Sequence, residues 1–356
     1  MKSISFFPRN IHCEMRSVGH VQGIAFDGEQ KYLYVSFTTA LMKVDVETGE
    51  TVGTVDGITG HLGCIDFCDK NGKLYGSIEY KHDQIGSNIA RRLGISLADE
   101  DAFYVAIFDV DKIDRVGMDA EKDGVMRAVY LPDVIDDFSA TLSDGTKHRH
   151  GCSGIDGITV GRVFGEDKDS CPHALFVAYG IYSDVERDDN DYQVLLRYDP
   201  DALDRVARPL SQLAPHHEGI AAEGKYLVYT GNTRYGIQNL EYDAHTGDYF
   251  AAVYKGKKEK FPNYPMFVID GGAPVTKATL DDGQVVNILS LKDTGIRDEA
   301  SGISGLDFPL GSTGLYSLGN GYFYVSHDGK TEDGTPLTDI HLYKFTGDET
   351  EPFVMM

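Results

Sequence analysis

The stretch Gly19-His20-Val21-Gln22-Gly23-Ile24 recurs in variant form along the chain, and this recurrence decides the fold. The other copies also place a glycine just ahead of an isoleucine or leucine: Gly60-His61-Leu62-Gly63-Cys64-Ile65, Ser153-Gly154-Ile155-Asp156-Gly157-Ile158, His216-His217-Glu218-Gly219-Ile220 and Ser301-Gly302-Ile303-Ser304-Gly305-Leu306. An aromatic, β-branched run follows, as at residues 31–37 and 174–179. The pattern predicts a repeating unit that is a small antiparallel sheet.

Repeated sheets of this kind stack around an axis as the blades of a β-propeller, so that the same position of every blade faces one central channel. We therefore expect an all-β chain forming a single propeller domain over residues 1–356. One propeller of this length is normal, because each blade packs only on its neighbours. The sequence favours five four-stranded blades. The alternative is six, if the phrase at residues 236–243 opens a blade of its own.

The strands of each blade are predicted from alternating apolar runs between turn residues. Blade one takes residues 23–26, 32–37, 41–46 and 51–55. Blade two takes 62–67, 74–80, 103–110 and 126–131, with a polar insertion at 81–101 that is a candidate lid. Blade three takes 154–160, 175–181, 194–198 and 206–210. The fourth blade begins at His216 and uses 226–230, and a sixth blade would use 250–254, 266–269 and 285–289. The last blade takes 302–308, 322–326 and 341–345, and residues 4–7 add a closing strand.

The run LYVSFTTALMKVDVETGETVGTV at residues 33–55 resembles the propeller repeat of the YVTN and NHL type. The similarity covers the last three strands of one blade well and the other blades loosely. It implies a propeller fold and no particular activity, because those families include binding platforms and enzymes alike.

The composition of the chain limits the classes of partner that it is expected to bind. A formal net charge of -23 opposes binding to a phosphate backbone or an anionic bilayer, so we expect neither nucleic acid nor membrane as a partner. No apolar run is long enough for a membrane span, and residues 1–9 hold no secretory signal. The five cysteines lack the spacing of a metal knuckle, and we expect buried free thiols in a cytoplasmic protein.

Two loops of each blade open on the same face of the ring, namely the loop that enters the first strand and the loop that leaves the second. The starts of the first strands place histidines there: His20, His61, His150 and His216. The ends of the second strands place further polar pairs on that face: Glu79 with His82, Tyr182 with Asp184, Asn232 with Arg234, and His327 with Asp328. The sequence thus predicts one polar, titratable channel mouth.

The four histidines His20, His61, His150 and His216 could bind a divalent metal at this mouth, because neutral imidazole is a ligand for Mn, Fe and Zn. Carboxylates such as Glu79, Asp184 and Glu218 would also suit Ca or Mn. The alternative is that the histidines donate hydrogen bonds between blades and stiffen the ring.

Cations and aromatic side chains at the same mouth suggest recognition of an acidic group. Arg149 and Arg234 could hold a carboxylate bidentately, although ion pairs with surface carboxylates are the alternative. Tyr235 could stack on a sugar ring, and Tyr182 could do so or supply a phenol for proton transfer. The remaining candidates for substrate contact are Asn232, His82 and His327.

Two classes of function remain open. The first is an intracellular metal-assisted hydrolase or lyase acting on a carbohydrate or another small polar or acidic substrate, with Glu79, Asp184, Glu218 or Tyr182 moving a proton. The second is a non-catalytic propeller that binds a protein or a small ligand. The gathering of titratable groups at one mouth and the absence of tryptophan favour the enzyme.

Overall fold

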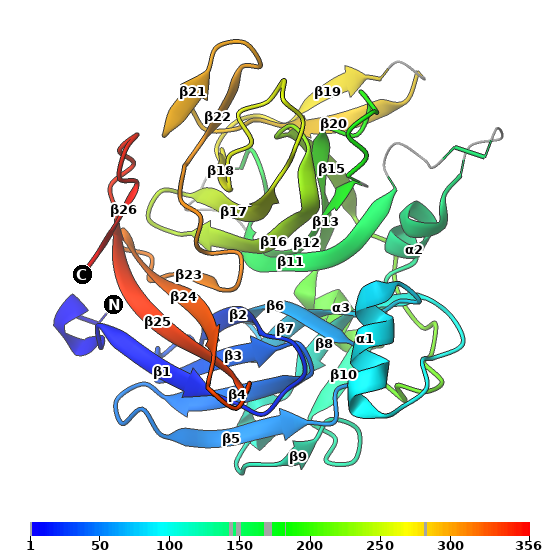
Figure 1. Ribbon diagram of the computed structural model, residues 1–356, viewed down its shortest axis with the longest axis vertical. Coiled ribbons are helices and arrows are strands. Elements are labelled where there is room, and N and C mark those ends of the chain that lie inside the picture. The colour runs from blue at the N-terminus through cyan, green and yellow to red at the C-terminus, as the bar shows by residue number, and fades with distance from the viewer. Residues whose placement is uncertain (1, 142–144, 147–150, 167–172, 182, 281–282) are drawn as a thin grey trace.

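The chain folds into a five-bladed β-propeller, as the sequence predicts (Figure 1). The computed structural model describes residues 2–141, 145–146, 151–166, 173–181, 183–280 and 283–356. Five strands, one from each blade, are neighbours around the central channel: β2 (Val21–Phe26), β6 (His61–Cys68), β11 (Cys152–Arg162), β16 (Thr233–Asp243) and β23 (Leu315–Ser317).

Blades one and two follow the predicted strands to within one or two residues. Outward from β2, blade one continues with β3 (Tyr32–Phe37), β4 (Ala40–Asp45), β5 (Thr51–Asp56) and the short parallel strand β9 (Met118–Asp119). Outward from β6, blade two continues with β7 (Lys73–Tyr80), β8 (Ala102–Phe108), β10 (Met126–Tyr130) and β14 (Arg208–Pro209). Short hairpins join most of these strands, which is why local sequence patterns predict them well.

Blade three corrects the predicted order of strands. It runs outward from β11 through β12 (His173–Ile181), β13 (Tyr192–Tyr198), β15 (Gly224–Tyr229), β20 (Val285–Leu289) and β19 (Thr276–Thr279). The predicted fourth strand at 206–210 is wrong, because α3 (Pro200–Val206) and then β14 carry the chain to the edge of blade two. The true fourth strand is β15, which had been assigned to blade four.

Blade four begins at β16, not at His216, and continues with β17 (Asp248–Lys255) and β18 (Met266–Ile269). The segment after His216 instead lies beside blade two, where Gly219 forms a parallel bridge with Tyr130. The phrase at 236–243 is therefore the inner strand of the fourth blade, and the blade count stays at five. A two-stranded ribbon follows, made of β21 (Ile296–Asp298) and β22 (Ile303–Gly305).

Blade five is closed by the N-terminal segment, as predicted, but with different residues. Its strands outward from β23 are β24 (Tyr322–Lys330), β25 (Pro336–Phe345) and β1 (Asn10–Glu14), and β26 (Phe353–Met355) also pairs with β25. The predicted closing strand at 4–7 is wrong, since the short 3-10 helix η1 (Ile4–Phe6) occupies that stretch. The predicted inner strand at 302–308 is also wrong, because β22 pairs with β21 outside the blade.

The remaining helices lie in the connections: α1 (Gln84–Leu93) in the insertion of blade two, η2 (Val110–Lys112) after β8, and α2 (Pro132–Ser139) before β11. No helix in the described ranges is long and apolar enough to cross a membrane. The cysteines that the structure describes, Cys13, Cys64, Cys68 and Cys152, are buried and free, in line with the predicted buried thiols.

The recurrent glycines allow the inner strands to approach one another. A Cβ atom on Gly23 would lie 2.9 Å from the Cα of Cys64, and one on Gly63 would lie 3.1 Å from the Cα of Asp156. These distances leave no room for a side chain at either position. Between the blades, buried apolar side chains form five clusters, each shared by two neighbouring blades. The repeat therefore marks positions that hold the ring together.

Candidate functional site

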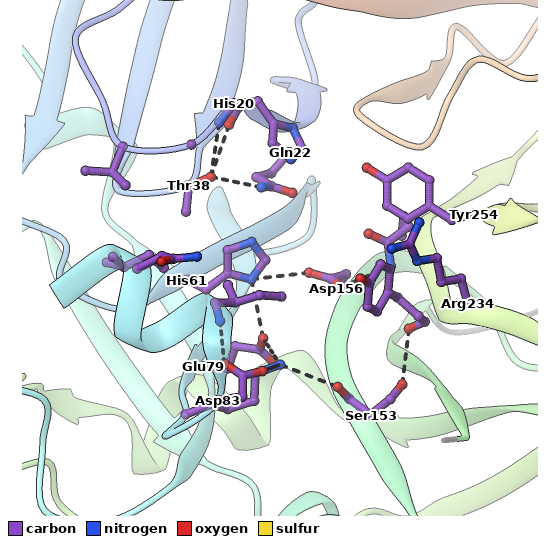
Figure 2. Close-up of a pocket in the computed structure, with 18 of the residues that line it drawn as sticks. His20, Gln22, Thr38, His61, Glu79, Asp83, Ser153, Asp156, Arg234 and Tyr254 are labelled. Atoms are coloured by element: carbon purple, nitrogen blue, oxygen red, sulfur yellow. Dashed lines mark hydrogen bonds and ion pairs between the residues drawn. The ribbon is translucent and has the colours of Figure 1, made fainter. Parts of the chain in front are cut away.

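A cavity of about 470 Å³ opens at the mouth of the channel where the inner strands begin (Figure 2). Blades one to four each contribute polar side chains to it, among them His20, His61, Glu79, Asp156 and Arg234. These side chains come from the starts of inner strands and the ends of second strands, or lie within a few residues of them. The cavity thus opens on the face of the ring where the sequence places its candidate residues.

Helix α1 forms one wall of this pocket, at the place predicted for a lid. The carboxylate of Asp83 caps its N-terminus by accepting hydrogen bonds from the backbone N–H groups of Ile85 and Gly86, both at 2.9 Å. The helix ends at Gly94 in the left-handed conformation, which glycine adopts without strain. Ile85, Ile89 and Arg92 line the pocket, so the insertion of blade two shapes the site.

A buried ion pair lies at the floor of the pocket. The Lys81 Nζ atom is 2.7 Å from Glu79 Oε1, and these side chains are 4% and 1% exposed. Glu79 Oε2 also accepts a hydrogen bond of 2.9 Å from the backbone N–H of Ile155. Lys81 contacts Asp83 as well, at 3.2 Å. Both charges are thus compensated from several sides, which a charge buried from water requires.

His61 and Asp156 lie beside this ion pair. The Nδ1 atom of His61 is 3.5 Å from Asp156 Oδ1 and 3.4 Å from Glu79 Oε1 (Figure 2). Asp156 Oδ2 accepts a hydrogen bond of 3.1 Å from the side-chain amide of Gln238. Asp156 Oδ1 is buried and accepts no hydrogen bond from a described residue. One carboxylate oxygen therefore faces the imidazole without a fixed donor.

Burial and neighbouring charge separate the protonation states of these groups. Burial raises the pKa of Asp156 to about 6, against the opposing charge of His61. Burial lowers the pKa of His61, but Glu79 and Asp156 outweigh this effect, so the pKa lies above its ordinary value of 6.5. Burial also raises the pKa of Glu79, yet the charges and hydrogen bonds of Lys81 and His61 together outweigh burial, and the net direction is down. The pocket thus holds a carboxyl group and an imidazole whose pKa values are both raised, a combination found at many functional sites.

Amide, guanidinium and aromatic groups surround the opening. The side-chain amide of Gln22 donates a hydrogen bond of 2.9 Å to Thr38 Oγ1. The guanidinium of Arg234 lies 5.1 Å from the centre of the Tyr235 ring, which in turn meets Tyr254 edge to face at 6.0 Å. Amides, a guanidinium and aromatic faces together suit a hydroxylated ligand that carries an acidic group.

Five of the residues predicted from the sequence meet in the pocket: His20, His61, Glu79, Arg234 and Tyr235. His20 turns its Nδ1 atom toward the backbone carbonyl of Val21, at 2.7 Å, and burial lowers its pKa. Asn232 lines a smaller adjoining cavity that shares Arg234.

Other predicted residues lie elsewhere. His216 packs edge to face on Tyr104 of blade two, because the segment that carries it is not an inner strand. Glu218 is exposed and pairs with Arg208 at 3.0 Å. Three further predicted residues do not line the pocket either: His82 contacts Asp101, His327 contacts Tyr343, and Asp184 accepts a hydrogen bond from the Glu186 backbone.

Three predicted residues, Tyr182, Arg149 and His150, lie outside the described residues. Four residues of the pocket were not predicted as site residues: Asp156, Lys81, Gln22 and Gln238. For three of these a signal existed, because Gln22 and Asp156 directly precede the glycine of a repeat copy and Gln238 is in the start-like phrase of blade four. The prediction used only the histidines of the repeat copies, because imidazole is a common metal ligand, and did not include these positions.

Metal binding gains no support from the described residues. Within these ranges, no three His, Cys, Asp or Glu side chains are grouped as a ligand set. The Lys81 ammonium occupies the place beside Glu79 that a cation would take. A raised pKa also favours the protonated form of His61, which is a poor ligand. The described residues of the pocket thus do not fit a metal. Metal binding by the four predicted histidines, of which His150 lies outside the described residues, stays a prediction.

No family model matches the chain, and no curated protein matches it. The YVTN or NHL type is therefore not identified, although the propeller fold is confirmed. Similar solved structures include the Dos1 propeller, with 10% identity over 88% of this chain and 68% of that chain and a TM-score of 0.32. The β-propeller domain of Myceliophteria thermophila Cps50 (Swd1) has 8% identity, coverage of 92% and 84%, and a TM-score of 0.34.

A third similar structure is the Bacillus subtilis arabinanase Arb43A, with 11% identity, coverage of 93% of this chain and 97% of that chain, and a TM-score of 0.37. Likenesses of this degree carry no argument about activity. The function has to be argued from the pocket itself.

Proposed function

We propose that the protein is an enzyme that cleaves a carbon–oxygen bond in a carbohydrate or a similar small polar substrate at the channel mouth. The observation that carries this proposal is the pair formed by Asp156 and His61. The two groups face each other at 3.5 Å on the floor of an open pocket, and no described residue donates a hydrogen bond to Asp156 Oδ1. A pair of titratable groups in a pocket, with pKa values moved toward neutrality, suits general acid–base catalysis.

In this proposal Asp156 is the base and His61 is the acid. Between the two pKa values Asp156 is ionised and His61 is protonated. The carboxylate takes a proton from water, or from carbon if the reaction is an elimination, and the imidazolium gives a proton to the leaving oxygen. Asp156 then returns its proton to the neighbouring imidazole, so each cycle restores the starting state.

The surrounding groups have separate roles. Glu79 is held by Lys81 and by the Ile155 backbone, so it acts by keeping His61 positively charged. Gln238 orients Asp156 through its amide. Arg234 is exposed at the opening and would hold an acidic group of the substrate. No step in this scheme uses a metal.

Product analysis tests the proposal. Wild-type protein and the Asp156→Asn variant are incubated with a panel of neutral and acidic oligosaccharides, and the products are identified by mass spectrometry. We expect cleavage by the wild type and not by the variant. Added water in the product indicates hydrolysis, and an unsaturated end indicates elimination. Binding of panel members without any cleavage would contradict the proposal and favour the non-catalytic propeller.

A further inference from the structure

Two further cavities adjoin the central pocket. One, of about 150 Å³, is lined by Val185, Asn232 and Lys257 and shares Arg234 with the central pocket. The other, of about 520 Å³, shares Val18 with the central pocket and is lined by a separate set: Arg16, Asp56, Thr59 and Leu93. Each neighbour shares a lining residue with the central pocket, so both outer cavities adjoin it, and we call the three cavities together the groove.

Helix α1 stands between the central pocket and the larger of these two cavities. Ile85 and Arg92 of this helix line the central pocket, and Leu93 lines the outer one. The insertion of blade two therefore extends the groove beyond the channel mouth. A substrate longer than one pocket could contact both sides of the helix end.

Basic side chains lie along the whole groove. Arg16, Arg92, Arg234 and Lys257 are exposed, and none of them makes an ion pair with a residue in the described ranges. The chain has 56 acidic residues against 33 lysines and arginines, so partners for a cation are abundant. Cations that pair with no acidic side chain in the described ranges, along one groove of an acidic protein, favour a negatively charged ligand there.

Exposed apolar and aromatic side chains accompany these cations. Four large side chains of this kind, between 37% and 47% exposed, line the three cavities: Ile85, Leu93, Val185 and Tyr235. Sugar rings offer apolar faces to such surfaces and hydroxyl groups to amides. The combination of these surfaces with unpaired arginines fits sugar units that carry carboxylates better than it fits uncharged sugars.

We infer that the groove binds a linear acidic oligosaccharide made of uronic acid units, with one linkage placed over Asp156 and His61. The position of that linkage rests on the proposed function, whereas the binding of the oligosaccharide does not. The outer cavities would hold units on either side of the central one. Affinity should then depend on chain length as well as on charge.

Calorimetric titration tests this inference. The Asp156→Asn variant, which should bind without cleaving, is titrated with linear galacturonate oligomers of increasing length and with uncharged xylose oligomers as controls. We expect affinity to rise with each added galacturonate unit until the groove is filled, and the xylose chains to bind more weakly. Equal affinity for all lengths, equal affinity for the uncharged chains, or no binding would overturn the inference.

Variants at the two ends of the groove test where the bound oligosaccharide lies. Arg16→Ala and Lys257→Ala, each made in the Asp156→Asn background, should lower affinity for the longest oligomer about threefold to fivefold, as expected for one exposed charge contact. The control Lys277→Ala removes the same charge from β19, outside the three cavities, and should change nothing. Equal weakening by the control would contradict the inference. If the oligomers bind in this way but wild-type protein leaves them intact, the proposed cleavage fails and the groove stands.

Discussion

The two mouths of the channel both bury carboxylates, and they differ in what those carboxylates contact. At the mouth where the inner strands end, Asp66 and Glu241 line a cavity of about 400 Å³. Asp66 accepts hydrogen bonds from the backbone N–H groups of Phe67 and Val160, at 2.7 and 2.6 Å, and from Thr159 Oγ1 at 3.0 Å. Its oxygens are thus occupied by fixed donors that tie β6 to β11.

At the opposite mouth, Asp156 Oδ1 has no such donor and faces an imidazole. Burial raises the pKa of both aspartates, to about 7 for Asp66 and about 6 for Asp156. A raised pKa therefore does not separate the two sites. The two mouths differ in the free carboxylate oxygen of Asp156, in the imidazole beside it and in the cations around its pocket. We therefore expect Asp66 to have a structural role and Asp156 to have the proposed catalytic role.

The largest expected effect compares the two aspartates directly. Asp156→Asn should lower kcat/KM about 10²- to 10⁴-fold, because the amide cannot accept the proton. Asp66→Asn should leave kcat/KM unchanged and lower the free energy of unfolding by about 1–3 kcal/mol, since the amide cannot accept all of the hydrogen bonds. Steady-state kinetics and urea denaturation of both variants measure this. Equal loss of activity in the two would remove the distinction between the mouths.

The buried ion pair gives the next largest effect. Lys81→Met removes the closest positive charge from the buried carboxylate of Glu79, so the free energy of unfolding should fall by about 3–5 kcal/mol. The double variant Glu79→Gln with Lys81→Met should recover much of that loss, because no lone charge remains. Urea denaturation of the two single variants and the double variant measures the coupling. Additive losses would show that the pair does not act as a unit.

The dependence of stability on pH should come largely from the mouth where the inner strands end, which holds Asp66 and Glu241. The pKa of Asp66 is raised from 3.8 to about 7, so the folded protein holds this proton more tightly than the unfolded chain does. Its contribution is fully present below about pH 4 and is lost as the pH rises through about 7. Asp156 and Glu241 act in the same direction. Denaturation at a series of pH values should show a shallower decline for Asp66→Asn. An unchanged slope would contradict the assignment.

The smallest effect is expected at Glu218, which the sequence placed among the catalytic residues. Its carboxylate pairs with Arg208 on the exposed edge of blade two. Glu218→Gln should leave kcat/KM unchanged and cost about 0–1 kcal/mol of unfolding free energy. A large loss of activity would show that this segment contacts the substrate, and would contradict the distinction between the pocket residues and exposed Glu218.

These residues also show how far the sequence could predict the molecule. Blades one and two were predicted well because their strands are joined mostly by hairpins, so that neighbours in space are also neighbours in sequence. The prediction failed where the chain leaves a blade. After β13 it passes to the edge of blade two and returns as β15, and no local pattern records such a detour.

The same limit of local sequence patterns explains which residues of the candidate site were predicted. His61 and Glu79 were predicted because they face each other across one hairpin of blade two, β6 and β7. Asp156 and Gln238 join them from two other blades, at a distance set by the closing of the ring. His216 was included wrongly because its local sequence resembles a blade start, while its segment packs on blade two. Local resemblance between the repeat copies predicted residues at the mouth of the channel, but the proposed catalytic pair depends on contacts between blades.

The central claim is that Asp156 and His61 act as base and acid at neutral pH, and the pH dependence of kcat/KM tests it most directly. We expect a rising limb with a midpoint near pH 6, from ionisation of Asp156, and a falling limb at higher pH as His61 loses its proton. Asp156→Asn should abolish the rising limb, and Asp66→Asn should retain it. A profile with no inflection near pH 6, or an unchanged rising limb in Asp156→Asn, would contradict the account.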